Sequence, residues 1–146
     1  MSLFDAIDTA ASGLSAERLR MDVTAENLAN AQTTRGADGQ PYRRKVVALE
    51  QAGGGFGATL SGAMGAGAGG DAGVRVAGIT QDATPNRLVY DPGHPDADAR
   101  GYVSMPNVQP VTEMVDLISA SRGYEANVTV MQTAKQMFSK TLEILR

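Results

Sequence analysis

The residues best suited to chemistry lie in one short stretch that is rich in turn sequences. Asp91, His94, Asp96 and Asp98 place three carboxylates and the only histidine of the chain within eight residues. Carboxylate oxygens and an imidazole nitrogen could ligate a divalent cation. The same stretch reads Asp-Pro-Gly and His-Pro-Asp, where Asp oxygens accept hydrogen bonds from nearby backbone N–H groups. We favour the turn interpretation and expect no metal site, which leaves a metal-dependent hydrolase as the weakest alternative.

Other kinds of catalytic or cofactor site have even less support in the sequence. The glycine-rich residues 53–57 and 65–70 lack the Lys-Ser/Thr pair that a phosphate-binding loop requires. The chain contains no cysteine, which excludes disulfides and thiolate metal ligands. Its histidine has no recognisable Ser or Asp context for nucleophilic catalysis. We therefore expect neither an enzyme nor a cofactor-binding protein.

Composition limits the classes of partner. The 146 residues carry a net charge of −3 and an apolar fraction of 42%, about one small domain without the basic stripe that nucleic-acid binding needs. The tight basic cluster of Arg43, Arg44 and Lys45 is too small to change that. Asp5 and Asp8 interrupt the place where a secretory signal would be basic and then apolar. No window approaches the roughly 20 apolar residues of a membrane span. We expect no nucleic acid, no membrane insertion and no cleavable signal peptide.

The elements that must position these residues begin with a long helical pattern at residues 111–146. Stepping alternately by three and four residues from Met114 meets a line of mostly apolar side chains, which share one face of a helix. A second apolar line beside it consists of Val130, Ala134, Met137 and Ile144. Gln132, Gln136, Ser139, Lys140 and Glu143 are left for solvent. The members of the first line that we expect to lie in an assembly interface are Met114, Leu117, Tyr124, Val128, Met131, Phe138, Leu142 and Leu145.

A second amphipathic helix is predicted at the other end of the chain, ending after Asn30. Its expected interface residues are Phe4 and the four that recur every seven positions, Ile7, Leu14, Met21 and Leu28. Gly13 inside this helix costs about 1 kcal/mol relative to Ala, so we expect a packing reason for it, and Gly123 could likewise allow a close approach. We expect Asn27 and Asn30 to cap the helix or to hydrogen-bond between subunits.

Between the helices the periodicity changes to that of a small β-rich insert. Strands are predicted near residues 42–51, 74–80, 86–90 and 102–105. In residues 52–73, 16 of 22 side chains belong to Gly or Ala. Such a segment buries too little surface to order itself, so we expect a mobile loop.

The predicted fold is mainly α, with long N- and C-terminal helices that form a discontinuous coiled-coil unit around the insert. Residues 1–34 form the first helical part, residues 35–106 the insert, and residues 107–146 the second helical part. Two amphipathic helices leave at least one apolar face exposed to water, which favours assembly with other chains. An intramolecular hairpin capped by the insert is the competing interpretation.

Several stretches of the sequence resemble those of a known protein family. Residues 12–21 and 25–34 resemble the N-terminal signature of bacterial flagellar rod and hook proteins. The run Asp-Pro-Gly-His-Pro-Asp-Ala-Asp-Ala at residues 91–99, together with residues 39–44, 106–108 and 113–127, is similar to the proximal-rod proteins of the flagellar basal body. The Gly/Ala-rich loop at residues 52–73 departs from that pattern.

The resemblance implies a structural subunit of the rod, which carries torque from the membrane ring through the periplasm to the hook. It implies export without a cleavable signal by the flagellar type III apparatus. The implied partners are further copies of the chain and the other rod proteins FlgB, FlgF, FlgG and FliE. The terminal helices would form the inner coiled-coil layer, with the insert outside. The alternative function is a cytoplasmic coiled-coil adaptor. We also expect the C-terminal helix to be poorly ordered in the isolated subunit and rigid in the rod.

Overall fold

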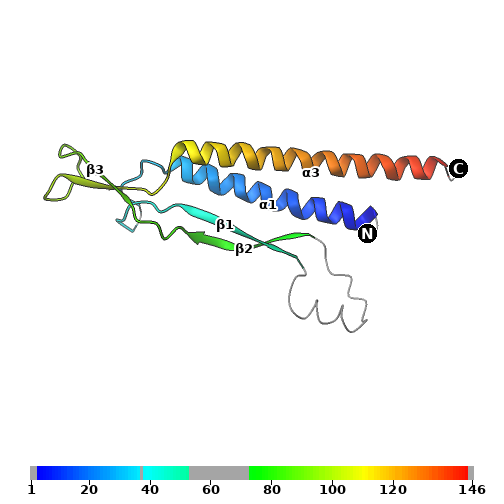
Figure 1. Ribbon diagram of the computed structural model, residues 1–146, viewed down its shortest axis with the longest axis horizontal. Helices are drawn as coiled ribbons and strands as arrows, with labels where there is room; N and C mark the ends of the chain where they lie inside the picture. Colours follow the sequence, from blue (N-terminus) through cyan, green and yellow to red (C-terminus); the bar gives the residue numbers. More distant parts are fainter. Residues whose placement is uncertain (1–2, 37, 53–72, 145–146) are drawn as a thin grey trace, which may run out of the picture. The chain divides into compact units, whose positions relative to one another are not determined.

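The computed structural model describes residues 3–36, 38–52 and 73–144, and two long helices enclose the strands in sequence (Figure 1). Helix α1 spans Leu3–Ala29 and helix α3 spans Pro110–Ile144. Four strands lie between them: β1 (Lys45–Gln51), β2 (Val74–Gln81), β3 (Arg87–Tyr90) and β4 (Tyr102–Met105). The predicted succession of helix, β-rich insert and helix is confirmed. The Gly/Ala-rich segment falls almost wholly at residues 53–72, outside the described part.

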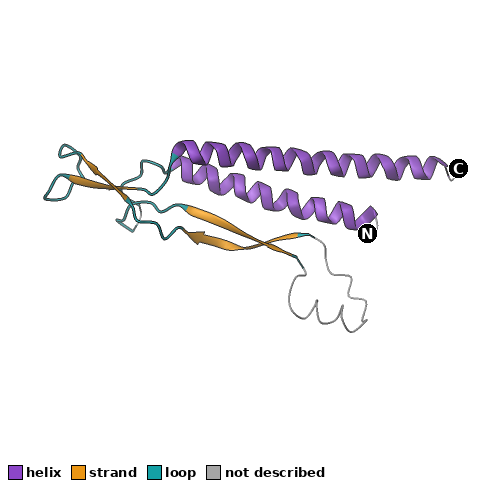
Figure 2. Ribbon diagram, viewed as in Figure 1, coloured by secondary structure: helices purple, strands orange, loops and turns teal. Residues whose placement is uncertain are grey.

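The strands form two small sheets, drawn as orange arrows in Figure 2. β1 pairs with β2, and β3 pairs with β4 in an antiparallel ladder. In the second sheet Val89 lies opposite Val103, which is buried, while the Tyr90 and Tyr102 rings meet edge to face with centroids 5.3 Å apart. Gly101 follows the intervening turn with a φ of +79°. A Cβ there would lie 2.9 Å from the Tyr90 ring, so this close turn requires glycine.

The chain divides into two compact units, each of which takes segments from both helices and from the insert. Of the described residues, the first unit contains 3–19, 48–52, 73–78 and 120–144, and the second contains 20–36, 38–47 and 79–119. Within each unit a segment of α1 is joined to a segment of α3 by side-chain contacts. No helix in the described ranges is long and apolar enough to cross a membrane.

α3 begins where the sequence predicts a helix start. Pro110 occupies the first helical position, where its missing N–H leaves no hydrogen bond unmade. α1 ends at Ala29, and Asn30 then donates from its side-chain amide to the Glu26 carbonyl at 2.9 Å. The backbone N–H of Asn30 donates to the same carbonyl at 3.1 Å. The Asn30 side chain therefore adds a second donor to the last turn of α1, within its own chain.

Candidate assembly site

A buried polar network in the second unit fixes the end of α1 to the start of α3. At its centre lies Asn27, which is 1% exposed. The Asn27 amide nitrogen donates to the Lys45 carbonyl at 2.8 Å and to Glu113 Oε2 at 3.0 Å. Its oxygen accepts from the Lys45 N–H and from the Tyr42 hydroxyl, both at 2.9 Å. A side-chain amide offers two donor and two acceptor positions, and all four are used here within one chain.

The second member at the centre is Glu113, which is also 1% exposed. Its Oε1 accepts from Arg44 Nε at 2.5 Å, and Arg44 also contacts Asp116 at 3.2 Å and Asp82 at 3.7 Å. The hydrogen bond with Glu113 raises the pKa of the Arg44 guanidinium, so it stays charged. A buried carboxylate is tolerated only when it is paired and hydrogen-bonded, and Glu113 meets both conditions.

The network also perturbs two further groups. Burial, followed by the negative charges of Glu26 and Glu113, raises the pKa of the Tyr42 phenol to about 12. Hydrogen bonds from the side-chain hydroxyl and then the backbone N–H of Thr84 lower the pKa of Asp82. At neutral pH Tyr42 is therefore a neutral donor, and Asp82 is an ionised acceptor.

In the first unit the helices meet through small side chains. Ala10 and Ala16 of α1 are buried, as are Ala120 and Ala134 of α3. A Cβ built on Gly13 would lie 2.9 Å from the Asn127 side-chain nitrogen. On the facing helix, a Cβ on Gly123 would lie 3.2 Å from the Glu17 side chain. Each glycine thus makes room for a polar side chain of the other helix, which is the packing reason expected for Gly13.

Hydrogen bonds also connect the start of β2 to α1. The Val74 N–H donates to the Ser12 hydroxyl at 3.1 Å, and that hydroxyl donates to the Thr9 carbonyl at 2.7 Å. The Ala52 N–H donates to the Gly73 carbonyl at 2.8 Å. Ala52 and Gly73 are therefore held together, and Val74 is held next to α1.

Most of the bulky residues predicted for the interface lie at the margins of the helix contact. On α3 the buried positions are Glu113, Ala120 and Ala134, with half-buried Asn127 completing a spacing of seven. This line is displaced by one residue from the one that begins at Met114. The predicted residues that are half-buried are Ile7, Leu14, Met21, Leu28, Asn30, Leu117, Tyr124, Val128 and Met131. Those exposed by 43–53% are Met114, Phe138 and Leu142. The side chain of Phe4 and the whole of Leu145 lie outside the described part.

Asn27 neither caps α1 nor is free to hydrogen-bond between subunits, the two roles expected from its sequence position. It lies inside α1, and its amide has no position left for a bond to a neighbouring subunit. The sequence alone did not reveal the partners of Asn27. Tyr42 looks like the start of a strand, and Arg44 looks like part of a basic cluster. Glu113 looks like an acidic residue that favours the start of a helix. The available signal was the polar side chain at an inward-facing position of α1, since a buried polar group requires partners.

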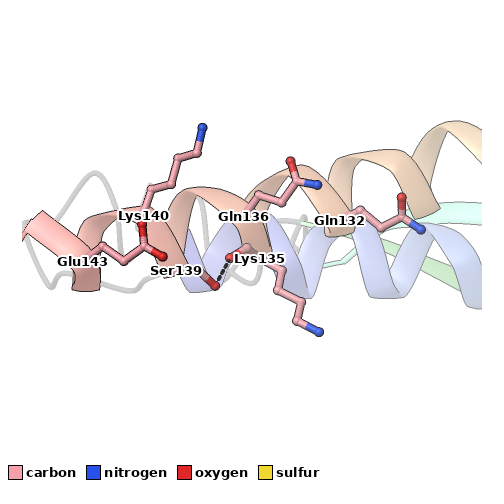
Figure 3. Close-up of a pocket in the computed structure, with 6 residues that line it drawn as sticks. All are labelled: Gln132, Lys135, Gln136, Ser139, Lys140 and Glu143. Carbon is pink, nitrogen blue, oxygen red and sulfur yellow. Dashed lines mark hydrogen bonds between the residues drawn. The ribbon is translucent and has the colours of Figure 1, made fainter.

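The polar face predicted for the second half of α3 is confirmed. Figure 3 shows this face, and all six of its labelled residues are exposed. Within it the Ser139 hydroxyl donates to the Lys135 carbonyl one turn earlier, at 3.1 Å. The face offers no enclosed site and supplies a control surface for mutation.

The turn interpretation of residues 91–98 is also confirmed. Asp91 Oδ1 accepts the Gly93 N–H at 3.2 Å, and Asp98 Oδ1 accepts the Arg100 N–H at 2.8 Å. Asp96 accepts the Thr34 hydroxyl at 2.8 Å and pairs with Arg35 at 3.1 Å. Across the described ranges, no cluster of three His, Cys, Asp or Glu side chains is placed to hold a metal ion.

The sequence of this chain is similar to those of known proteins. The family model described as "Flagella basal body rod protein" matches residues 7–37, and that described as "Flagellar basal body rod FlgEFG protein C-terminal" matches residues 99–144. The flagellar basal-body rod protein FlgC of Bacillus subtilis is 49% identical over 148 residues, covering 99% of both chains. FlgC of Escherichia coli O157:H7 is 47% identical over 144 residues, covering 99% of this chain and 98% of the relative. FlgC of Aquifex aeolicus is 39% identical over 143 residues, covering 98% and 97%.

The segments that carry the similarity are those joined by the contacts described above. The first family match contains Asn27, Thr34 and Arg35, and the second contains Glu113 and Asn127. The chain belongs to the FlgC family of flagellar basal-body rod proteins, and it is a structural rod subunit of the flagellar basal body.

Proposed function

We propose that this chain is a subunit of the proximal rod, and that it assembles through its terminal helices into a coiled-coil layer that transmits torque from the membrane ring to the hook. In this proposal residues 1–34 and 107–146 form the rod core and residues 35–106 lie outside it. Torque passes through interlocked side chains, so the protein is not an enzyme and no step of its function is catalytic.

One observation carries the proposal. Among the described residues, every buried apolar side chain is an alanine, a valine or a proline. Leu, Ile, Phe and Met side chains each contribute about 1.5–3 kcal/mol when they are fully buried. In the free subunit these residues remain half-buried or exposed, with Leu142 53% exposed and Met137 51% exposed. The apolar surface that normally drives folding is therefore left for contacts with other chains.

The proposed partners are further copies of the chain and the rod proteins FlgB, FlgF, FlgG and FliE. The proposed route is export by the flagellar type III apparatus, without a cleavable signal, to a rod that crosses the periplasm. The absence of cysteine is compatible with this route, because no disulfide has to form after export.

The test compares one charge introduced on two faces of α3. Leu142→Asp places a carboxylate on the exposed apolar face, whereas Gln136→Asp places it on the polar face of Figure 3. Burying a charge without a partner is unfavourable, so we expect Leu142→Asp to abolish rods and swimming and Gln136→Asp to preserve both. Leu28→Asp on α1 is expected to behave like Leu142→Asp. Normal rods with Leu142→Asp would contradict the proposal, and a purely soluble pool of the unmodified chain would favour the adaptor.

A further inference from the structure

The outward face of α3 is apolar at its first turns. Val111, Val115 and Ile118 are 75%, 60% and 55% exposed. Steps of four and then three residues place them on one side of the helix. Glu113 and Ala120, which are buried, lie on the other side. Such a line of anchors is the surface that a second helix covers.

The outward face of α1 has a complementary shape. Its exposed positions recur at the same three- and four-residue steps, and from residue 11 onward they are mostly small: Ala11, Ser15, Arg18, Asp22, Ala25 and Ala29. Alanine and serine leave room for branched side chains from a neighbouring helix. From residue 11 onward the charged residues on this line are Arg18 and Asp22. Asp5 and Asp8 precede them on the same line, and exposed Glu26, beside Ala25, pairs with Lys45 of its own chain.

The charges determine how the two faces can meet. Along α1 the order is Arg18 and then Asp22, and along α3 the outward face continues with Arg122 and then Glu125. All four are exposed, and no ion pair within the described part of the chain involves them. A parallel arrangement would set positive against positive and negative against negative. An antiparallel arrangement pairs opposite charges at both positions.

We propose that the outward face of α3 in one copy packs antiparallel against the outward face of α1 in a second copy. Arg122 then pairs with Asp22, Glu125 pairs with Arg18, and Ile118 packs on Ala25. This inference rests on the proposed function and names the neighbour that covers this face. Each face lies on the side of its helix away from the buried contacts of its own chain. The contact joins two different surfaces, so it repeats from copy to copy as a rod requires.

Cysteine crosslinking between copies tests the register, because the natural chain contains no cysteine. Two single variants, Ala25→Cys and Ile118→Cys, are co-expressed in cells that lack the natural gene, and their basal bodies are purified and oxidised. A disulfide between these variants can form only between copies. We expect a disulfide-linked dimer on a non-reducing gel. The control mixture of Ala11→Cys with Ile118→Cys is expected to give none, because Ala11 lies about 21 Å along the helix from Ala25, beyond the ~7 Å reach of a disulfide.

The outcomes separate this inference from the proposed function. Failure of the unmodified chain to enter basal bodies would overturn the proposed function itself. Assembled rods that contain both cysteine variants without their dimer would overturn only the contact. A dimer in the control mixture, or a crosslink from Ile118→Cys to a different rod protein, would also overturn it.

A charge exchange provides a second measurement that does not depend on oxidation. Arg122→Glu sets a carboxylate against Asp22, so we expect loss of swimming. Adding Asp22→Arg restores an opposite pair and should restore swimming. Full motility with Arg122→Glu alone, or no recovery in the double variant, would contradict the proposed contact.

Discussion

Asn27→Asp is the substitution that examines the buried network most sharply, because it keeps the shape of the side chain and changes only its hydrogen-bonding chemistry. The remaining oxygen can still accept from Tyr42 and from the Lys45 N–H. The second oxygen replaces the donor that now serves the Lys45 carbonyl at 2.8 Å and Glu113 Oε2 at 3.0 Å. Two oxygen acceptors would therefore face the introduced carboxyl without a proton between them.

The expected cost follows from these contacts. Losing a hydrogen bond to a charged group costs about 1.5–3 kcal/mol, and losing one to a neutral carbonyl costs about 1 kcal/mol. A proton bound by the introduced carboxyl would restore one bond, but holding it at neutral pH against a pKa near 4 costs about 4 kcal/mol. The ionised route therefore costs about 2.5–4 kcal/mol and the protonated route about 5 kcal/mol or more, so the lower-cost ionised route sets the expected loss in the free energy of unfolding. Since small domains have only about 5–15 kcal/mol in total, most of the folded population is at risk.

The measurement is urea unfolding followed by far-ultraviolet circular dichroism, and Asn30→Asp is the matched control. Asn30 makes a single exposed side-chain donation to its own helix, so its substitution should cost about 1 kcal/mol. Adding Glu113→Gln to Asn27→Asp returns an N–H donor to the pair and should recover about 2 kcal/mol. The deficit of Asn27→Asp should grow as pH rises above about 4, because the folded state favours the protonated carboxyl there. Equal stability of the Asn27→Asp and Asn30→Asp chains would refute the reasoning.

Three further predictions concern the helices and the tyrosine. Gly13→Val should lower the melting temperature, because its two methyl groups extend beyond a Cβ position that already lies 2.9 Å from the Asn127 side-chain nitrogen. Gly13→Ala adds only the Cβ, which a small shift of the Asn127 amide can admit, and it gains helix propensity, so its loss should be far smaller; equal losses would contradict this. Folded-state stability should fall between about pH 10 and about pH 12, because the raised pKa of Tyr42 lets the unfolded chain lose its proton first; ultraviolet titration should show one late tyrosine, absent in Tyr42→Phe. The second half of α3, whose bulky side chains are exposed in the single chain, should gain helicity on assembly, whereas the unit that holds the Asn27 network unfolds cooperatively in the isolated subunit; full helicity of α3 in the monomer by circular dichroism would contradict this.

The sequence predicts the elements well, because their signals are local. The apolar periodicity of α3 and the position of Pro110 locate that helix in the sequence without any knowledge of tertiary contacts. The hairpin of β3 and β4 likewise follows from short β-prone runs around a glycine-containing turn. Such signals depend on backbone geometry and on neighbours within one turn.

The contacts between elements are harder to predict, because the pattern of large apolar side chains along a helix does not show which helix face is buried within the single chain. Leu142 and Met114 are predicted for an assembly interface. Within the single chain the buried line passes instead through Ala120 and Ala134, where small side chains let two helices approach. The network around Asn27 joins side chains 86 residues apart in sequence, so no local pattern connects them. The sequence gives one indication: Asn27 is a polar residue at a position of α1 that faces inward, and a buried polar side chain needs hydrogen-bond partners.

A structure of the intact basal body containing this chain would test whether its bulky apolar side chains are reserved for assembly. We expect Val111, Val115, Ile118 and Leu142, which are 53–75% exposed in the single chain, to be covered by neighbouring subunits. The polar face that carries Gln136 should keep more of its exposure than these residues. Apolar faces left open to solvent on the rod, with contacts made through other surfaces, would contradict this explanation.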